Sequence, residues 1–159
     1  GTDVNKLLLD SSEVCWLDKN NAFDCADMDA LHTRAPTPKT YNDLALSGSG
    51  ACAVKTDGTL ECWDDGGQST NPFGRLDPPS GSNYKQVVLG NDTGCALQQN
   101  GKVRCWSMSS RTYAQTQPTG TFDKIRLTSG TLCGLHPDKT LDCWELCGSN
   151  DGQSKICNR

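Results

Sequence analysis

The most constraining feature of this 159-residue chain is a set of ten cysteines that form five pairs, each pair ten residues apart. Four of the pairs lie inside one sequence unit that repeats every 37 to 43 residues. A fixed period of this length is typical of folds built from stacked copies of one unit. We therefore expect a single repeat domain over residues 1–159, with repeats at about 1–38, 39–81, 82–119 and 120–159.

Apolar residues recur at fixed distances from the first cysteine of each repeat. The positions eleven, eight and six residues before it hold Val4, Leu7 and Leu9; Tyr41, Leu44 and Leu46; Tyr84, Val87 and Leu89; and Phe122, Ile125 and Leu127. Positions two and eight residues after it are also apolar, as Leu17 and Phe23 show in the first repeat. Spacing with period two predicts strands with a buried face, and each repeat is expected to hold three.

Turn residues between the last two strands of each repeat predict hairpins. A three-residue loop from Thr56 to Gly58, with a left-handed glycine, would place Cys52 directly opposite Cys62. Directly opposed strand residues are close enough for a disulfide, so each hairpin can be stapled without moving its backbone. Lys139 occupies the left-handed position in the fourth repeat, where we expect a strain of roughly 1 kcal/mol.

The pattern of cysteines also bears on the compartment and on metals. Disulfides persist in oxidising environments, so the chain is expected to be secreted, periplasmic or exposed at a cell surface. Zinc is the competing interpretation, but a spacing of ten with a hairpin between differs from the short spacing of zinc knuckles. No apolar run approaches the roughly 20 residues of a membrane helix, and no membrane insertion is expected.

Charge and motifs argue against several functions. A net charge of −4 without a lysine or arginine cluster disfavours nucleic acid. His32 and His136 are isolated from any nucleophile motif, and the acidic pairs Asp27–Asp29 and Asp64–Asp65 are more typical of solvated loops than of glycosidase or calcium chemistry. We therefore expect a protein that is not an enzyme and that needs no cofactor or metal.

Three segments carry a resemblance to a known family: GACAVKTDGTLECWDDGGQ at 50–68, GCALQQNGKVRCW at 94–106 and LCGLHPDKTLDCW at 132–144. They resemble regulator-of-chromosome-condensation repeats, in the cysteine-bearing style related to beta-lactamase-inhibitor protein II. The resemblance implies an all-β, propeller-like array of about four blades, whereas the family usually has seven. The glycine-glutamine pair that commonly follows the tryptophan is displaced in the last repeat by Glu145, Leu146 and Cys147.

The low blade count leaves three arrangements open: a four-bladed ring, an open array, or a ring or fibre tip completed by other chains, which allows a homo-oligomer. An open array must protect its end strands. Trp16 stands where the other repeats have a small residue, which fits an end cap, and a Cys147–Cys157 bridge would lock the C-terminal end. Trp63, Trp106 and Trp144 occupy equivalent positions and are expected to pack the blades.

Recognition residues are expected in the loops between repeats, because variable loops on a stiff scaffold commonly carry binding. The aromatic and basic residues that the repeat does not explain are Trp16, Phe73, Arg75, Arg111 and Tyr113. Asn91 begins a formal N-glycosylation motif. The leading hypothesis is an extracellular adhesin or lectin-like tip that binds a glycan or protein on a cell surface. The alternatives are a secreted inhibitor of an enzyme and an enzyme with an undetected site.

Overall fold

The computed structural model describes residues 3–9, 14–26, 30–48, 50–66, 76–90, 93–106, 117–128, 131–148 and 154–158. Its strands form four separate antiparallel sheets, one per repeat, which we call blades 1 to 4. Blade 1 holds β1 (Val4–Leu9), β2 (Val14–Asp18) and β3 (Phe23–Cys25), and blade 2 holds β4 (Tyr41–Ser47), β5 (Gly50–Lys55) and β6 (Leu60–Asp64). Blade 3 holds β7 (Tyr84–Leu89), β8 (Gly94–Gln98) and β9 (Val103–Trp106), and blade 4 holds β10 (Lys124–Leu127), β11 (Thr131–Leu135), β12 (Leu141–Gly148) and β13 (Ser154–Asn158).

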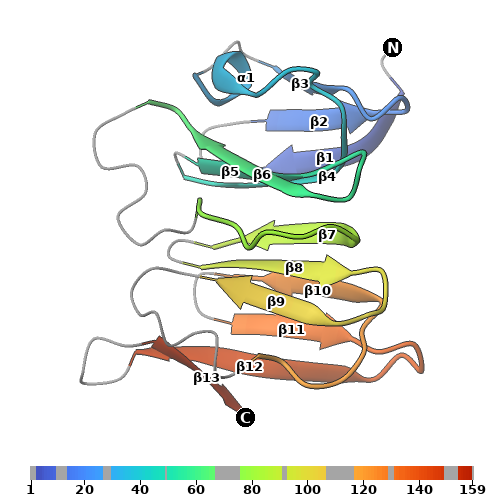
Figure 1. Cartoon of the computed structure of the whole chain (residues 1–159), viewed down its shortest axis with the longest axis vertical. Helices are drawn as coiled ribbons and strands as arrows, with labels where there is room; N and C mark the ends of the chain where they lie inside the picture. Colours follow the sequence, from blue (N-terminus) through green and yellow to red (C-terminus); the bar gives the residue numbers. More distant parts are fainter. Residues whose placement is uncertain are drawn as a thin grey trace.

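The blades follow one another in chain order, from blade 1 at the top of Figure 1 to blade 4 at the bottom. This arrangement confirms the predicted all-β, propeller-like array of four blades. Leu7 of blade 1 and Leu141 of blade 4 are 56% and 65% exposed, so the two ends of the array do not bury each other as neighbouring blades do. Among the described residues, no helix is long and apolar enough to span a membrane.

Four hairpins carry the predicted disulfides, with the two cysteines directly opposite each other in the strand register. The bridges are Cys15–Cys25, Cys52–Cys62, Cys95–Cys105 and Cys133–Cys143, with Cα–Cα distances of 3.9 to 4.1 Å. The turn residues Asn21, Gly58, Gly101 and Lys139 are all left-handed, with φ between 62° and 80°. The predicted turn geometry is confirmed, including the strained Lys139.

A fourth strand, β13, pairs with the far half of β12. In this register Cys147 lies opposite Lys155 and Cys157 lies opposite Glu145, so the two cysteines are not direct cross-strand partners. Their side chains lie outside the described residues. The Cys147–Cys157 bridge therefore stays a prediction, unlike the four hairpin bridges.

The core consists of three apolar layers, each between two neighbouring blades. One side of blade 1, represented by Leu8, Leu17 and Phe23, packs against Leu44 and Trp63 of blade 2. The other side of blade 2 packs against blade 3, and the far side of blade 3 packs against blade 4, with the same repeat positions in contact. The three repeat tryptophans are 5% to 8% exposed, in keeping with their predicted role in blade packing.

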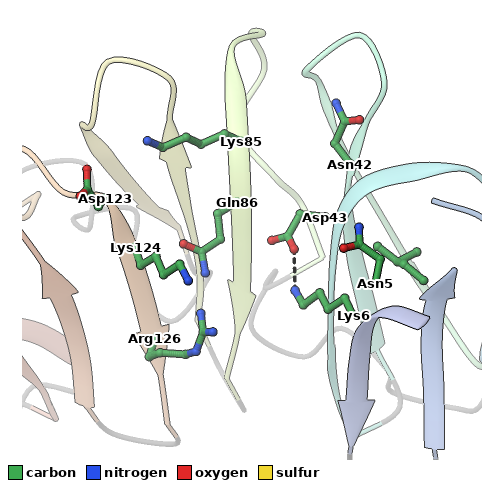
Figure 2. Close-up of a pocket in the computed structure, with 10 residues that line it drawn as sticks. Asn5, Lys6, Asn42, Asp43, Lys85, Gln86, Asp123, Lys124 and Arg126 are labelled. Carbon is green, nitrogen blue, oxygen red and sulfur yellow. Dashed lines mark hydrogen bonds and ion pairs between the residues drawn. The ribbon is translucent and has the colours of Figure 1, made fainter. Parts of the chain in front are cut away.

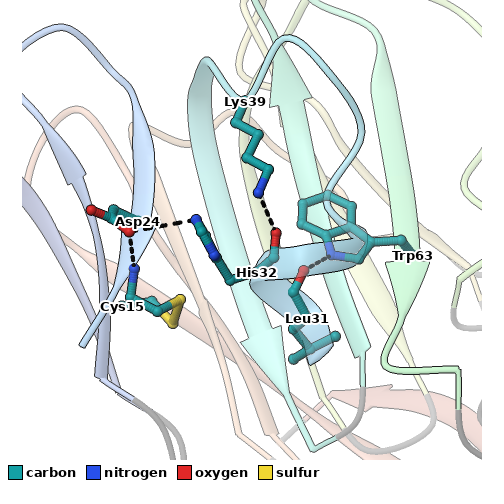
Figure 3. Close-up of a disulfide and its surroundings, with 7 residues drawn as sticks. Cys15, Asp24, Leu31, His32, Lys39 and Trp63 are labelled. Carbon is teal, nitrogen blue, oxygen red and sulfur yellow. Dashed lines mark hydrogen bonds and ion pairs between the residues drawn. A yellow bond between two sulfur atoms is a disulfide. The ribbon is translucent and has the colours of Figure 1, made fainter. Parts of the chain in front are cut away.

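A single helical turn, α1 (Ala30–Arg34), covers the outer strands of blades 1 and 2 (Figure 3). Trp63 donates its indole N–H to the carbonyl oxygen of Leu31 at 2.8 Å, and Lys39 donates to that of His32 at 2.6 Å. This helical turn thus covers the outer edge of the apolar layer between blades 1 and 2.

Candidate functional site

A polar pocket of about 410 Å³ lies on the innermost strands of all four blades (Figure 2). It is lined by two consecutive positions of every repeat, ten and nine residues before the first cysteine. These are Asn5 and Lys6, Asn42 and Asp43, Lys85 and Gln86, and Asp123 and Lys124, joined by Leu17 and Arg126. We call this cavity the inner pocket. Its volume lies within the range of small-ligand sites.

The backbone explains why two consecutive side chains reach the same pocket. In a regular strand, neighbouring side chains point to opposite faces. The pairing of the first two strands shifts register by one residue at Asn5, Asn42 and Lys85, as a β-bulge does. A bulge re-aims side chains and is frequent beside functional sites. The same β-bulge therefore recurs in three blades, each time at the edge of the inner pocket.

Polar side chains on the wall of the inner pocket also tie each blade to the next. Lys6 donates to the Asp43 carboxylate at 2.5 Å and to the carbonyl oxygen of Leu44 at 2.6 Å. Asp43 in turn accepts from the backbone N–H of Val87 at 2.8 Å. Buried charges need such partners, and Asp43 is only 8% exposed. The first half of the pocket wall is thus rigidly held.

The next junction uses an amide in place of the ion pair. Gln86 donates to the carbonyl oxygen of Ile125 and accepts from its backbone N–H, both at 2.9 Å. An amide side chain can make both bonds because it carries a donor and an acceptor. Lys6, Asp43 and Gln86 therefore all bond to the backbone of the following blade.

The charge of the inner pocket is opposite in sign to that of the chain. Four basic and two acidic residues line it, whereas the whole chain carries −4. Asp43 already pairs with Lys6, and Asp123 lies 3.5 Å from Lys139. The side chains of Lys85 and Lys124 make no hydrogen bond or ion pair with another residue in the described part of the chain, and Figure 2 shows both beside the cavity. The pocket is suited to carboxylate, sulfate or phosphate groups.

A second cavity of about 280 Å³ shares Lys6, Gln86 and Arg126 with the inner pocket. Its other walls are the apolar side chains of the same four innermost strands, such as Leu44 and Val88. A ligand that enters the inner pocket with a charged group could therefore extend an apolar part along the strands.

The structure places only one of the five predicted binding residues. Trp16 lies half-buried in β2, on the face of blade 1 that points away from blade 2, and it does not line the inner pocket. Phe73, Arg75, Arg111 and Tyr113 lie outside the described residues, as does Asn91. The loop hypothesis therefore stays a prediction for these four residues.

The two histidines, the only ones in the chain, belong to structural contacts. His32 lies 3.4 Å from the Asp24 carboxylate (Figure 3). His136 bonds through Nδ1 to the carbonyl oxygen of Thr121 at 2.8 Å and through Nε2 to Asp142 at 2.9 Å. Its hydrogen bond with Asp142 raises the pKa of His136 above the ordinary value. Within the described residues, no three histidine, cysteine or acidic side chains gather as metal ligands would.

Comparison with known proteins finds similarity in structure alone. No protein-family model matches the chain, and no curated protein matches its sequence. The ectodomain of the Physcomitrella patens receptor kinase CR4 superposes with a TM-score of 0.68 at 21% identity, over 89% of this chain and 38% of that one. The Arabidopsis thaliana ACR4 ectodomain gives 0.60 at 20% identity, over 91% and 50%.

Saccharomyces cerevisiae Prp20p gives a TM-score of 0.58 at 18% identity, over 96% of this chain and 49% of that one. Prp20 is the yeast RCC1, a protein described as binding Gsp1p and histones. The chain thus spans half or less of the length of these three structures. At these identities the likeness shows the fold, and that fold is a propeller of the RCC1 type.

Proposed function

We propose that the chain is a non-enzymatic extracellular recognition module, an adhesin or lectin-like tip, whose inner pocket holds acidic groups of a glycan or protein on a cell surface. The observation that carries this proposal is the positive pocket in an otherwise acidic chain. Its basic residues stand on innermost strands rather than on loops, so they are pre-positioned for binding.

The compartment fits this role. Four disulfides indicate an oxidising environment, which a secreted, periplasmic or surface-exposed protein meets. Two of the similar structures are receptor ectodomains, which gives a precedent for this fold outside the cell. The resemblance to the beta-lactamase-inhibitor style of repeat remains a proposal based on sequence motifs, and stoichiometric capture of an enzyme would be its test.

Binding to immobilised acidic and neutral oligosaccharides tests the proposal. We expect acidic glycans to bind and Lys85→Glu or Arg126→Glu to weaken binding about tenfold or more, because each reverses a charge at the pocket. The matched control is Arg104→Glu, since Arg104 is exposed on the outermost strand of blade 3. Equal binding by all three variants, or equal binding of neutral glycans, would contradict the proposed site.

A further inference from the structure

The contacts between neighbouring blades follow one rule at all three internal junctions. The left-handed turn residue of one blade accepts a backbone hydrogen bond from the first strand of the next. The three bonds run from Tyr41 to Asn21 at 2.9 Å, from Tyr84 to Gly58 at 3.0 Å and from Phe122 to Gly101 at 2.9 Å. A polar side chain on the innermost strand also bonds to the backbone of the next blade at Leu44, Val87 and Ile125.

The third element of the rule is apolar burial. The residue that receives the polar bond is completely covered: Leu44, Val87 and Ile125 are 0%, 0% and 1% exposed. Each is buried because the preceding blade packs against it. Every junction therefore combines a backbone bond at the turn, a polar bond at the inner strand and a buried apolar residue.

Blade 1 carries the receiving half of this junction with no blade before it in the described chain. We call this side, made of Val4, Leu7, Leu9, Val14 and Trp16, the leading face. Leu7 is the counterpart of Leu44, Val87 and Ile125, yet it is 56% exposed. Leu9 and Val14 are 68% and 46% exposed, and the strand register places Leu9 opposite Val14 and Leu7 opposite Trp16 on the same side of the sheet. These residues form a continuous apolar surface.

Blade 4 carries the donating half, which we call the trailing face: Lys124, Cys133, Leu135, Lys139, Leu141 and Cys143. Leu141 is 65% exposed, whereas its counterparts Phe23 and Val103 are 3% exposed and Leu60 is half-buried. The counterparts of Leu135 are also covered, at 1% or less, while Leu135 is half-buried. The disulfide of blade 4 is partly exposed, although Cys15, Cys52 and Cys95 of the preceding blades are 0% exposed.

The structure thus presents two complementary halves of one junction, and we propose that the trailing face of one copy docks on the leading face of a second copy. Lys124 would donate to the carbonyl oxygen of the second copy's Leu7, as Lys6 does to that of Leu44. The carbonyl of Lys139 would accept from the backbone N–H of Val4, the bond made at each internal turn. Leu141 would pack against Val4 and Trp16.

Two such junctions close a ring of two copies, because each copy supplies one leading and one trailing face. The size of the array fits this closure. The chain aligns along 91% and 96% of its length with ACR4 and Prp20p and covers 50% and 49% of those chains. Two copies therefore supply about as much chain as one of these propeller structures, and the inner pockets of both would face the same axis.

The test is the molar mass of the 159-residue chain in solution, measured by light scattering over a range of concentrations. We expect about twice the 17.1 kDa of one copy. Leu7→Glu and Leu141→Glu each place a charge at an exposed position, so the monomer should fold while the dimer dissociation constant rises about tenfold or more. Arg104→Glu, outside both faces, should leave the dimer intact.

Mixing the two variants separates head-to-tail docking from other pairings. In the mixture, the intact trailing face of the Leu7→Glu chain and the intact leading face of the Leu141→Glu chain can form one unmodified junction, while the second junction of the ring carries both substitutions. Neither variant alone can form an unmodified junction, so we expect the mixture to recover a dimer, held by that one junction, more strongly than either variant alone. A monomer at all concentrations, an open polymer, or a dimer sensitive to only one of the two substitutions would overturn the proposal. These outcomes do not depend on any ligand, and so they leave the glycan-binding test separate.

Accessibility of the last disulfide gives a second readout. Docking should cover Cys133–Cys143, as the following blade covers the other three bridges. We expect mild reductant to open it in the Leu7→Glu monomer several times faster than in the wild-type dimer. Equal rates in the two chains would contradict docking at this face, whereas retained protection of the first three bridges shows that the monomer is folded.

Discussion

Blades 1 and 4 differ at two repeat positions that face each other, because the bulky residue lies at a different one of the two positions in each blade. In blade 4 the aromatic ring comes from Phe122, before the first strand, and the facing position on β11 is Gly134. A Cβ atom at Gly134 would lie 2.5 Å from the Phe122 ring. In blade 1 the same two positions hold Val4 and Trp16. The bulky side chain of this pair therefore comes from a residue before the first strand in blade 4 and from the second strand in blade 1.

The largest expected effect is on the free energy of unfolding. It compares the same repeat position on a face that a neighbouring blade covers and on the uncovered leading face. Ile125→Ala should lower the free energy of unfolding by about 2–5 kcal/mol, because the side chain is buried between two blades. Leu7→Ala should change that of the monomer by about 0.5 kcal/mol or less. Urea unfolding at a dilution where the chain is monomeric measures both. Similar losses at the two positions would contradict the open leading face.

A smaller effect tests whether the Phe122 ring occupies the space that a side chain at position 134 would need. Gly134→Ala should destabilise the protein by about 1–3 kcal/mol, because the added methyl group meets the buried Phe122 ring. Adding Phe122→Val, which copies the small residue of blade 1, should make the double variant less destabilised than the two single losses added together. A double-mutant cycle of urea unfolding measures this coupling. Strict additivity would show that the two positions do not share their space.

The smallest effect concerns pH. His136 of blade 4 pairs with Asp142, while its counterpart in blade 1, Asp18, caps its own turn by accepting from the backbone of Asn20 and Ala22. The hydrogen bond to Asp142 raises the pKa of His136 above 6.5. The protonated pair therefore stabilises the fold below about pH 6.5, and this contribution fades as pH rises through the raised pKa.

Melting temperatures between about pH 5.5 and 8 check this expectation. The wild-type chain should lose a small part of its stability across this range, and His136→Gln should lose less. Asp18→Asn is the matched control in blade 1, because it removes the equivalent turn contacts and leaves the His136–Asp142 pair intact, so the change that depends on His136 should persist in this variant. If the melting temperatures of wild type and His136→Gln changed in parallel with pH, the His136–Asp142 pair would not be the source of the pH dependence.

Much of the fold could be predicted from the sequence because the pattern of each strand occurs four times, once in every repeat. The opposed cysteines Cys52 and Cys62 and the left-handed Gly58 together determine the turn type, and the structure has this turn. The register of β13 was not predicted, since its pairing with β12 lies outside the repeat. The exposure of Leu7 was not predicted either, because a sequence pattern indicates which residues are apolar but not which blade covers them.

The candidate site was missed for a physical reason. Binding residues are expected in irregular loops, whereas the inner pocket is built from regular repeat positions such as Asp43 and Gln86. Its signal was present: the two positions after the first apolar residue are polar in every repeat. Without the bulge, one of the two would point away from the cavity, and a one-residue register shift cannot be read from periodicity.

The polar bonds between blades have a consequence for how such a chain can evolve. Gln86 recognises the peptide group of Ile125 rather than its side chain, and Lys6 does the same at Leu44. A peptide group is identical at every residue, so these bonds to the backbone place no demand on the side chain of the residue that receives them. Duplicated copies of a blade could thus diverge in sequence, or be gained and lost, without a matching substitution in the neighbour.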